Sequence, residues 1–282
     1  MNATLSIERD FLALAERISA GLGAPRVRAF HLPTREPSSA NEAGFCALEL
    51  EDGSVGMSFV LADDRSRLVH ASRSLKGIPG RDALSLAEGC LAQDPAARTL
   101  GFAAINALSQ QLFVRARWIP KSAGDSLGQL APKAGEHIGM IGLFPRLVAR
   151  ISEVEAKLTV LELRAELEGR RDGYRVTLDP ADLATCDKVL STCTVLLNGS
   201  LNAVLEACRG VSSLAIVGPT AGCVPDLLFD RGVDTVGGTR VVDLEGFRKA
   251  FREGAPWGRF VEKYAIARQD YPGVDWLLAR VV

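Results

Sequence analysis

Two glycine-containing turns carry the residues best suited to approach a ligand. Each turn follows a short apolar run, and together they supply Gly142, Phe144, Pro145, Gly218, Pro219 and Thr220. Glycine lets the backbone come close to a ligand, and amides at a helix start favour anions. The spacing matches neither the dinucleotide fingerprint nor the Walker loop. The turns therefore predict where a ligand lies without identifying it, and tight turns with no ligand are the alternative.

Polar side chains follow other predicted strands close to these turns. Glu162 stands twenty positions after Gly142, where adenosine-binding folds keep the carboxylate that holds the ribose. Thr192 supplies a neutral donor and acceptor at the end of a further strand. Asn198 is suited either to a ligand or to turning the chain before the helix that starts at Ser200. A solvated carboxylate remains the alternative for Glu162.

The cysteines and histidines offer metal and acid–base chemistry without a recognisable motif. Cys193 and Cys223 stand in neighbouring predicted rim loops, so their thiolates could converge on a soft metal ion, or both could pack as small apolar side chains. The three histidines, His31, His70 and His137, are isolated in sequence. No set of acid, base and nucleophile can be assembled, so catalysis stays open.

Composition excludes several classes of protein. The 282 residues are 47% hydrophobic with a formal net charge of −1, which gives no electrostatic footprint for nucleic acid. No stretch approaches the roughly 20 apolar residues of a membrane span, and the first ten residues lack the pattern of a secretory signal. We therefore expect a cytoplasmic protein with reduced cysteines, no nucleic-acid partner and no membrane span.

The first part of the chain predicts an α+β unit. An amphipathic pattern covers residues 6–22, and Asp52-Gly53 joins two apolar runs as a hairpin. Helices are expected over 82–92 and 95–116, the second capped by Asp94. The periodicity then weakens, which suggests a connector. The predicted division is 1–120 for an amino-terminal domain, 121–136 for the connector and 137–282 for a second domain.

The second part of the chain alternates strands and helices. The strands are expected near 137–143, 157–163, 188–192, 213–218 and 234–236, with helical stretches near 146–156, 181–186, 200–208 and 224–231. This order predicts a parallel sheet with helices on both faces. Such sheets bind ligands beyond the carboxyl ends of their strands, at the switch in strand order, and that rule places the turns, Glu162, Thr192 and the two cysteines on one rim.

Several segments together resemble a known family. They are Ile138-Gly139-Met140-Ile141-Gly142-Leu143-Phe144-Pro145, Thr192-Cys193-Thr194-Val195-Leu196-Leu197-Asn198-Gly199-Ser200-Leu201, Val217-Gly218-Pro219-Thr220, Leu228-Phe229-Asp230-Arg231-Gly232-Val233 and Gly238-Thr239-Arg240-Val241-Val242-Asp243. The chain resembles the putative heavy-metal chelatase family. The resemblance implies a domain similar to the enolase amino-terminal domain followed by a Rossmann-like α/β domain. The segment 99–108 is similar to the family's helix that presents an Asn, here Asn106.

The resemblance also implies a ligand pocket between the two domains. Its predicted lining is Asn106, Gly142, Phe144, Pro145, Glu162, Thr192, Asn198, Gly218, Pro219 and Thr220. This chain departs from the family at Cys193, where small residues are usual, and at 221–223.

The function expected is binding or handling of a small anionic or metal-chelating ligand, with or without a heavy-metal ion, by a chain that forms a homodimer. One alternative is a nucleoside-cofactor enzyme, such as a transferase with an adenosine-containing cofactor held by Glu162. Another is a scaffold whose rim loops only mediate dimer contacts.

Overall fold

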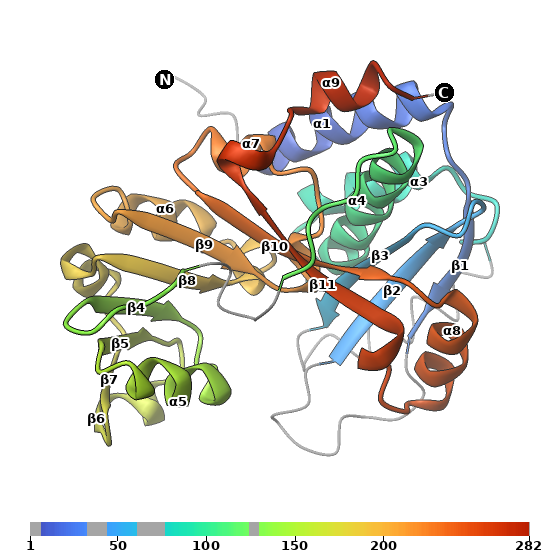
Figure 1. The fold of residues 1–282 in the computed structure, drawn as a ribbon. Helices are drawn as coiled ribbons and strands as arrows, with labels where there is room; N and C mark the ends of the chain where they lie inside the picture. Colours follow the sequence, from blue (N-terminus) through green and yellow to red (C-terminus); the bar gives the residue numbers. More distant parts are fainter. Residues whose placement is uncertain (1–6, 33–43, 61–76, 124–129, 282) are drawn as a thin grey trace.

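The computed structural model describes residues 7–32, 44–60, 77–123 and 130–281 (Figure 1). The amino-terminal part contains α1 (Ile7–Leu22), β1 (Val27–His31), β2 (Gly44–Leu50), β3 (Val55–Val60), α3 (Ala83–Ala87), the 3₁₀ turn η2 (Glu88–Leu91) and α4 (Pro95–Arg115). The strands form an antiparallel sheet in the order β1-β2-β3. The predicted hairpin between β2 and β3 and the Asp94 cap of α4 are both present.

Helix α4 lies very close to the three-stranded sheet because the contact is made through small residues. A Cβ atom placed on Gly56 of β3 would lie 2.1 Å from the carbonyl oxygen of Ala103 in α4. Only glycine permits this approach. The polar residues of α4 that face inward, Asn106 among them, are therefore held within hydrogen-bonding distance of backbone atoms.

The remaining chain forms an eight-stranded sheet with helices on its faces. Its strands are β4 (His137–Ile141), β5 (Lys157–Leu161), β6 (Gly169–Arg171), β7 (Tyr174–Thr177), β8 (Lys188–Thr192), β9 (Ser213–Val217), β10 (Thr235–Val241) and β11 (Val261–Ala267). The order is β11-β10-β9-β8-β4-β5-β7-β6, and only β6 and β11 run antiparallel to their neighbours. The predicted mixed α/β fold with a mostly parallel sheet is confirmed.

The helical elements of this part are α5 (Pro145–Glu153), α6 (Leu201–Ala207), α7 (Asp226–Phe229), α8 (Leu244–Glu253) and α9 (Val274–Leu278). Short 3₁₀ turns lie between them: η3 (Ala165–Leu167), η4 (Pro180–Thr185), η5 (Cys193–Leu196), η6 (Pro219–Ala221), η7 (Gly258–Phe260) and η8 (Arg268–Asp270). The helix expected over 181–186 is thus the 3₁₀ turn η4. The strands β6, β7 and β11 were not predicted, because their short or mixed sequences carry little periodicity.

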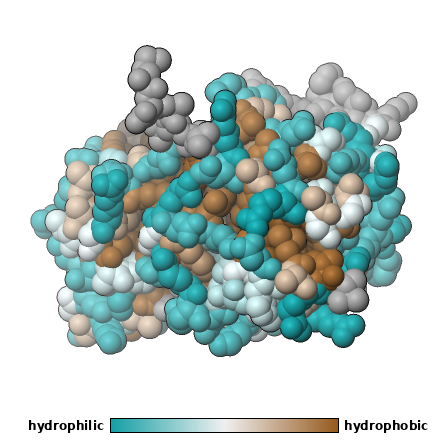
Figure 2. All heavy atoms as spheres, turned by 90° about the horizontal axis from the view of Figure 1, so that it is seen from above, coloured by the Kyte–Doolittle hydropathy of each residue, from teal (hydrophilic) through white to brown (hydrophobic). Residues whose placement is uncertain are grey.

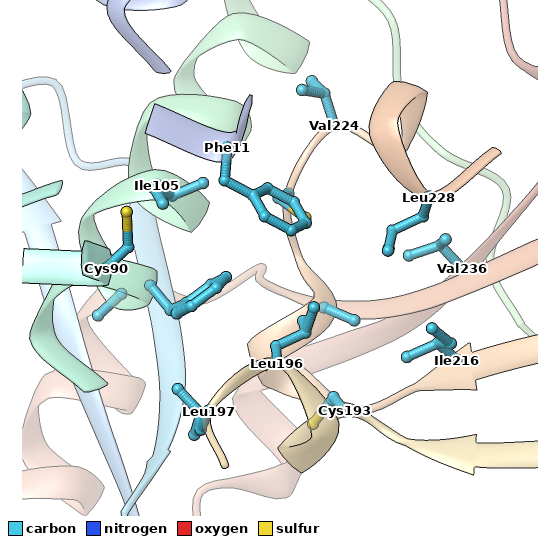
Figure 3. Packing of buried hydrophobic residues seen from close by; sticks show 14 of the residues in the cluster. Phe11, Cys90, Ile105, Cys193, Leu196, Leu197, Ile216, Val224, Leu228 and Val236 are labelled. Atoms are coloured by element: carbon cyan, nitrogen blue, oxygen red, sulfur yellow. The ribbon is translucent and has the colours of Figure 1, made fainter. Parts of the chain in front are cut away.

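One hydrophobic cluster joins the two parts of the molecule. Phe11 of α1 and Ile105 of α4 belong to the same cluster as Leu196 of η5, Ile216 of β9 and Leu228 of α7 (Figure 3). A second connection comes from α8, whose Phe247 and Phe251 pack with Ala47, Val55 and Met57 of the three-stranded sheet. The division into domains 1–120 and 137–282 stays a prediction.

The outer surface mixes polar and apolar side chains. Figure 2 views the face that carries α1 and α9 and shows hydrophilic residues interspersed among smaller hydrophobic areas. The large apolar side chains that are exposed include Leu91, Val114, Ile119, Leu163, Val242 and Trp276. Within the described ranges, no helix has both the length and the hydropathy to cross a membrane.

Candidate functional site

The parallel sheet has its switch in strand order between β4 and β8. These strands are hydrogen-bonded neighbours, although β5 and β7 separate them along the chain and lie on the other side of β4. The loops that leave the carboxyl ends of β4 and β8 consequently diverge to opposite faces, which opens a crevice in sheets of this kind. Gly142 and Thr192 meet there: a Cβ on Gly142 would lie 3.1 Å from Cγ2 of Thr192. The predicted rim is therefore formed at the switch point.

Glu162 belongs to this rim and fixes the loop after β4. Its Oε1 accepts a hydrogen bond of 2.8 Å from the amide of Leu143, and its Oε2 accepts one of 3.2 Å from the amide of Leu163. Arg164 lies 3.5 Å from the same carboxylate. The Gly142 amide donates to the carbonyl of Leu161. Two amides that could have held an anion are thus engaged within the protein.

The start of α5 presents the next amides of the same loop. Phe144 is the N-cap residue and makes no side-chain capping bond, while Pro145 occupies the first helical position. The Leu147 and Val148 amides both donate hydrogen bonds to the Phe144 carbonyl. An uncapped helix start carries partial positive charge. The α5 start therefore carries partial positive charge. Thr192 and Thr194, both partly exposed, follow β8 on the other side of the switch, and their hydroxyls bond to each other at 3.2 Å.

Asn106 contacts the predicted rim loop after β9, in a cluster of hydrogen bonds between the two parts of the molecule. Its side-chain amide donates to the carbonyls of Met57 at 2.8 Å, Thr220 at 2.8 Å and Pro219 at 3.3 Å. The Thr220 hydroxyl accepts from the amide of Phe59 at 2.9 Å. Asn106 and Thr220 are 1% and 0% exposed. In this arrangement they tie β3 and α4 to η6, and their role in ligand binding stays a prediction.

Gly218 and Cys193 connect this cluster of hydrogen bonds to the loop after β8. Gly218 has φ 131°, a conformation that favours glycine, and a Cβ there would lie 2.4 Å from the sulfur of Cys193. The Thr220 hydroxyl and the amides of Thr220 and Ala221 are directed to the same sulfur. The Gly218 amide itself donates to the carbonyl of Gly237 in β10. The second predicted anion loop is thus packed around a cysteine.

The two cysteines of the predicted metal pair lie near each other in the interior. The Cys193 thiol contributes to the raised pKa of Cys223, and burial, the larger cause, raises that pKa to about 12. Burial also raises the pKa of Cys193, against the hydrogen bonds it receives. Both thiols are accordingly protonated at neutral pH. Among the described residues, no three His, Cys, Asp or Glu side chains form a group able to hold a metal ion.

Asn198 is engaged in a turn, and the role in ligand binding that the sequence analysis gave it stays a prediction. Asn198 is exposed and accepts hydrogen bonds from the amide and hydroxyl of Ser200, so it forms the turn before α6. His31 contacts Glu49 on the three-stranded sheet, and His137 starts β4 at the opposite edge from the rim. His70 falls outside the described residues.

Comparisons with known proteins identify the family. Residues 125–269 match a family described as "Putative heavy-metal chelation", and residues 43–109 match a second family of the same description. The first match alone spans half of the chain. This chain belongs to the family that residues 125–269 match.

Solved structures of the family have the same fold. A protein of unknown function from Pyrococcus horikoshii aligns with a TM-score of 0.65 and 20% identity, over 93% of this chain and 98% of its own. A second protein of unknown function, from Desulfitobacterium hafniense, aligns with a TM-score of 0.61 and 18% identity, over 92% and 99%. Both come from the DUF364 family, which is the family that residues 125–269 of this chain match.

An uncharacterized protein of Methanocaldococcus jannaschii is 29% identical over 154 residues, which is 52% of this chain and 56% of that protein. The match thus spans little more than half the length of this curated relative. A member of the enolase superfamily from Roseovarius nubinhibens aligns with a TM-score of only 0.32. The enolase-like and Rossmann-like descriptions of the two parts therefore stay predictions.

Proposed function

We propose that the rim between β4 and β8 binds a small anionic ligand that chelates a heavy-metal ion, the metal arriving as cargo of the chelator. The observation that carries the proposal is the uncapped start of α5 at the switch point, with Thr192 beside it. The α5 start would hold an anionic oxygen of the ligand. The Thr192 and Thr194 hydroxyls would orient its neutral or charged groups. The family description supports a chelate as the ligand.

The sequence analysis offered Cys193 and Cys223 as metal ligands or, alternatively, as packing groups. Both sulfurs are protonated and enclosed, and hydrogen-bond donors face that of Cys193. This state does not suit direct ligation of a metal ion, since the thiolate is the ligating form. The proposal therefore assigns recognition of the chelate to the rim and leaves the two cysteines as packing groups.

Calorimetric titration of the full chain tests the proposal with citrate, Zn²⁺, Cd²⁺ and the two metal–citrate complexes as probes. We expect a metal–citrate complex to bind more tightly than citrate or either metal alone. The double variant Thr192→Val/Thr194→Val keeps the side-chain shape and removes both hydroxyls. It should weaken binding about tenfold, because each neutral hydrogen bond contributes roughly 0.5–1.5 kcal/mol.

Ser212→Ala is the control, since Ser212 carries an exposed hydroxyl just before the amino end of β9, at the opposite edge of the sheet. Wild-type protein that binds none of the five probes would contradict the proposal, as would equal binding by the double variant and the control. The nucleoside alternative is tested in the same titration with AMP and NAD: binding of either that Glu162→Ala abolishes would favour it. Sedimentation of the purified protein tests the predicted homodimer.

A further inference from the structure

The face of the sheet opposite α5 carries a row of cationic residues along its β5-β7-β6 edge. Arg170 of β6 pairs with Arg175 of β7, which pairs in turn with Thr159 of β5. Lys157 stands two residues before Thr159 on the same strand and pairs with His137 of β4. Paired residues, and residues two apart on one strand, project from the same face. These five side chains consequently share one face.

That face is polar near the amino ends of β4, β5 and β7, whereas toward the carboxyl ends it carries the buried Ile141 and Leu161. The other face of β4, β5 and β7 is apolar and packs against Leu147 and Ile151 of α5. On the polar face, the turn η4 covers β4: a Cβ on Gly139 would lie 3.0 Å from Leu183 and 3.1 Å from the sulfur of Cys186. Beyond η4 the sheet is open toward its edge, and the cationic row borders this opening.

A cavity of about 450 Å³ lies at this opening. Its lining residues are His137, Lys157, Leu158, Thr159, Arg170, Arg171, Gly173, Tyr174, Arg175, Asp182 and Thr185. This volume falls within the range of small-molecule sites. Four of the lining residues carry a permanent positive charge, and one carries a carboxylate. The cavity is thus a concave surface with a large excess of positive charge.

The protein compensates the charges of the cavity only in part. Arg175 pairs with Asp182 at 2.9 Å, and Asp182 also accepts from the hydroxyl of Thr177. Within the described ranges, the side chains of Lys157 and Arg170 make no ion pair or hydrogen bond. Like charges directly opposite each other on neighbouring strands are destabilising. The Arg170–Arg175 pair therefore costs stability that a bound anion would restore.

His137 in the lining of the cavity is a polar group with a fixed orientation. The Nδ1 of His137 lies 3.0 Å from the carbonyl of Thr185, so it carries the proton and donates. The Nε2 then accepts from the hydroxyl of Thr159 at 2.8 Å. Burial, and secondly the charge of Lys157, lower the pKa of His137. His137 is thus a neutral group whose orientation two hydrogen bonds define, and its environment is electropositive.

We propose that this cavity binds a small multivalent oxyanion of the phosphate or polycarboxylate class. The planar guanidinium groups of Arg170 and Arg175 would donate hydrogen bonds to its oxygens, and the Lys157 ammonium would add a positive charge. The site lies at the amino ends of β4, β5 and β7, the opposite edge from the rim at the carboxyl ends of the strands (Figure 1). It is therefore separate from the chelate site proposed above.

Titration of the full chain with pyrophosphate and with citrate tests the proposal and distinguishes its two sources of anionic oxygen. Lys157→Met/Arg170→Gln should weaken binding of the preferred anion at least tenfold without lowering the melting temperature, since both side chains are exposed and unpaired among the described residues. The His137 imidazole resonances of the wild type should shift on anion binding, because the anion would change the field at the ring.

Lys249→Met/Arg259→Gln is the matched control. It removes the same two charges from exposed positions on α8 and η7, at the other end of the molecule (Figure 1). Equal loss of affinity in the control would show a general charge effect and overturn the proposal. Wild-type protein that binds neither anion at millimolar concentration would also overturn it.

The rim variant separates the two proposals. Binding of pyrophosphate that Thr192→Val/Thr194→Val abolishes and Lys157→Met/Arg170→Gln leaves intact would place the anion at the rim, which overturns this inference and supports the rim proposal. Binding of pyrophosphate that Lys157→Met/Arg170→Gln abolishes and Thr192→Val/Thr194→Val leaves intact supports the cavity. The rim proposal is then tested by its own titration with the metal–citrate complexes.

Discussion

Asn106 shows how a polar residue that resembles a ligand-binding group is used within the fold. Its amide donates to three backbone carbonyls from β3 and η6, elements far apart in the sequence. Its side-chain oxygen has no partner among the described residues. The donors hold the two parts of the molecule together, and the unpartnered oxygen is the one atom of the group that remains for another role.

Asn106→Ala should destabilise the protein by about 2–3 kcal/mol, because buried carbonyls lose their donor. Urea unfolding measures the change. Asn198→Ala is the matched control: it removes an exposed amide that only forms the turn before α6, so about 1 kcal/mol or less is expected. Equal stability of the two variants would show that Asn106 is not the structural tie inferred from its contacts.

His137 gives the protein a pH dependence in the range just below neutrality. Burial and the Lys157 charge lower its pKa from the ordinary 6.5, so the folded state favours the neutral ring. The unfolded chain binds the proton first as the pH falls. The stabilisation is therefore complete above pH 6.5 and is lost as the pH decreases from 6.5 through the lower pKa of the folded state.

We expect the free energy of unfolding of the wild type to fall between pH 6.5 and 5, and that of His137→Gln to fall less over this interval. Carboxylates such as Glu262, whose pKa hydrogen bonds from Ser122 and Arg240 lower below 4.5, do not titrate there. Denaturant unfolding at a series of pH values measures both slopes. Identical slopes would exclude His137 as the titrating group.

At the scale of elements, α8 illustrates packing that joins distant parts of the chain. Its Phe247 and Phe251 are fully buried against β2 and β3, and its Arg248 bonds to Glu49 of β2. Glu49 is 1% exposed at its side chain. Burial opposes ionisation of Glu49, but the hydrogen bonds from Arg248 and His31 hold its pKa below the ordinary value. The carboxylate is thus charged inside the interface between α8 and the sheet.

Arg248→Met should destabilise the protein by up to about 3–5 kcal/mol, because it leaves a buried carboxylate without its main partner. Glu49→Gln/Arg248→Met should be more stable than Arg248→Met alone, since the buried side chain that lost its main partner is then neutral. Thermal unfolding at neutral pH compares the three proteins. A double variant less stable than the single one would contradict this account of the ion pair.

Local patterns predicted most of the elements. The Asp94 cap defined the start of α4, and the Asp52-Gly53 turn defined the hairpin. The β6-β7 hairpin escaped prediction although Asp172-Gly173 joins its strands, since the flanking residues are charged and lack alternation. The cationic cavity was not predicted either, because its residues meet only through pairing of the four strands β4, β5, β7 and β6.

At the scale of the whole molecule, the hydrophobic core does not divide where the chain changes its pattern. The main cluster includes residues from Ile7 of α1 to Leu277 of α9. The aromatic contact between Trp118 and Tyr271, at 5.6 Å between ring centroids, also connects the two parts. A shared core makes the parts unfold together, since neither can lose its structure without exposing apolar surface of the other.

We therefore expect one cooperative thermal transition for the full chain, with equal calorimetric and van't Hoff enthalpies. A chain that ends at residue 243 lacks α8, the sheet strand β11 and α9. It exposes the apolar face of β2 and β3 and should melt at a markedly lower temperature. Differential scanning calorimetry measures both proteins. Two resolved transitions in the full chain would instead support the independent domains 1–120 and 137–282 of the sequence prediction.

The sequence by itself determined the mixed α/β class, the mostly parallel sheet and the rim at the ends of β4 and β8, because periodicity, caps and turns are local properties. Tertiary structure decided which groups at that rim are available to a ligand. The Leu143 amide is engaged by Glu162, and amides of the Gly218 turn are directed to Cys193. Whether a buried donor or acceptor is engaged depends on partners that are distant in the chain, and no local pattern records them.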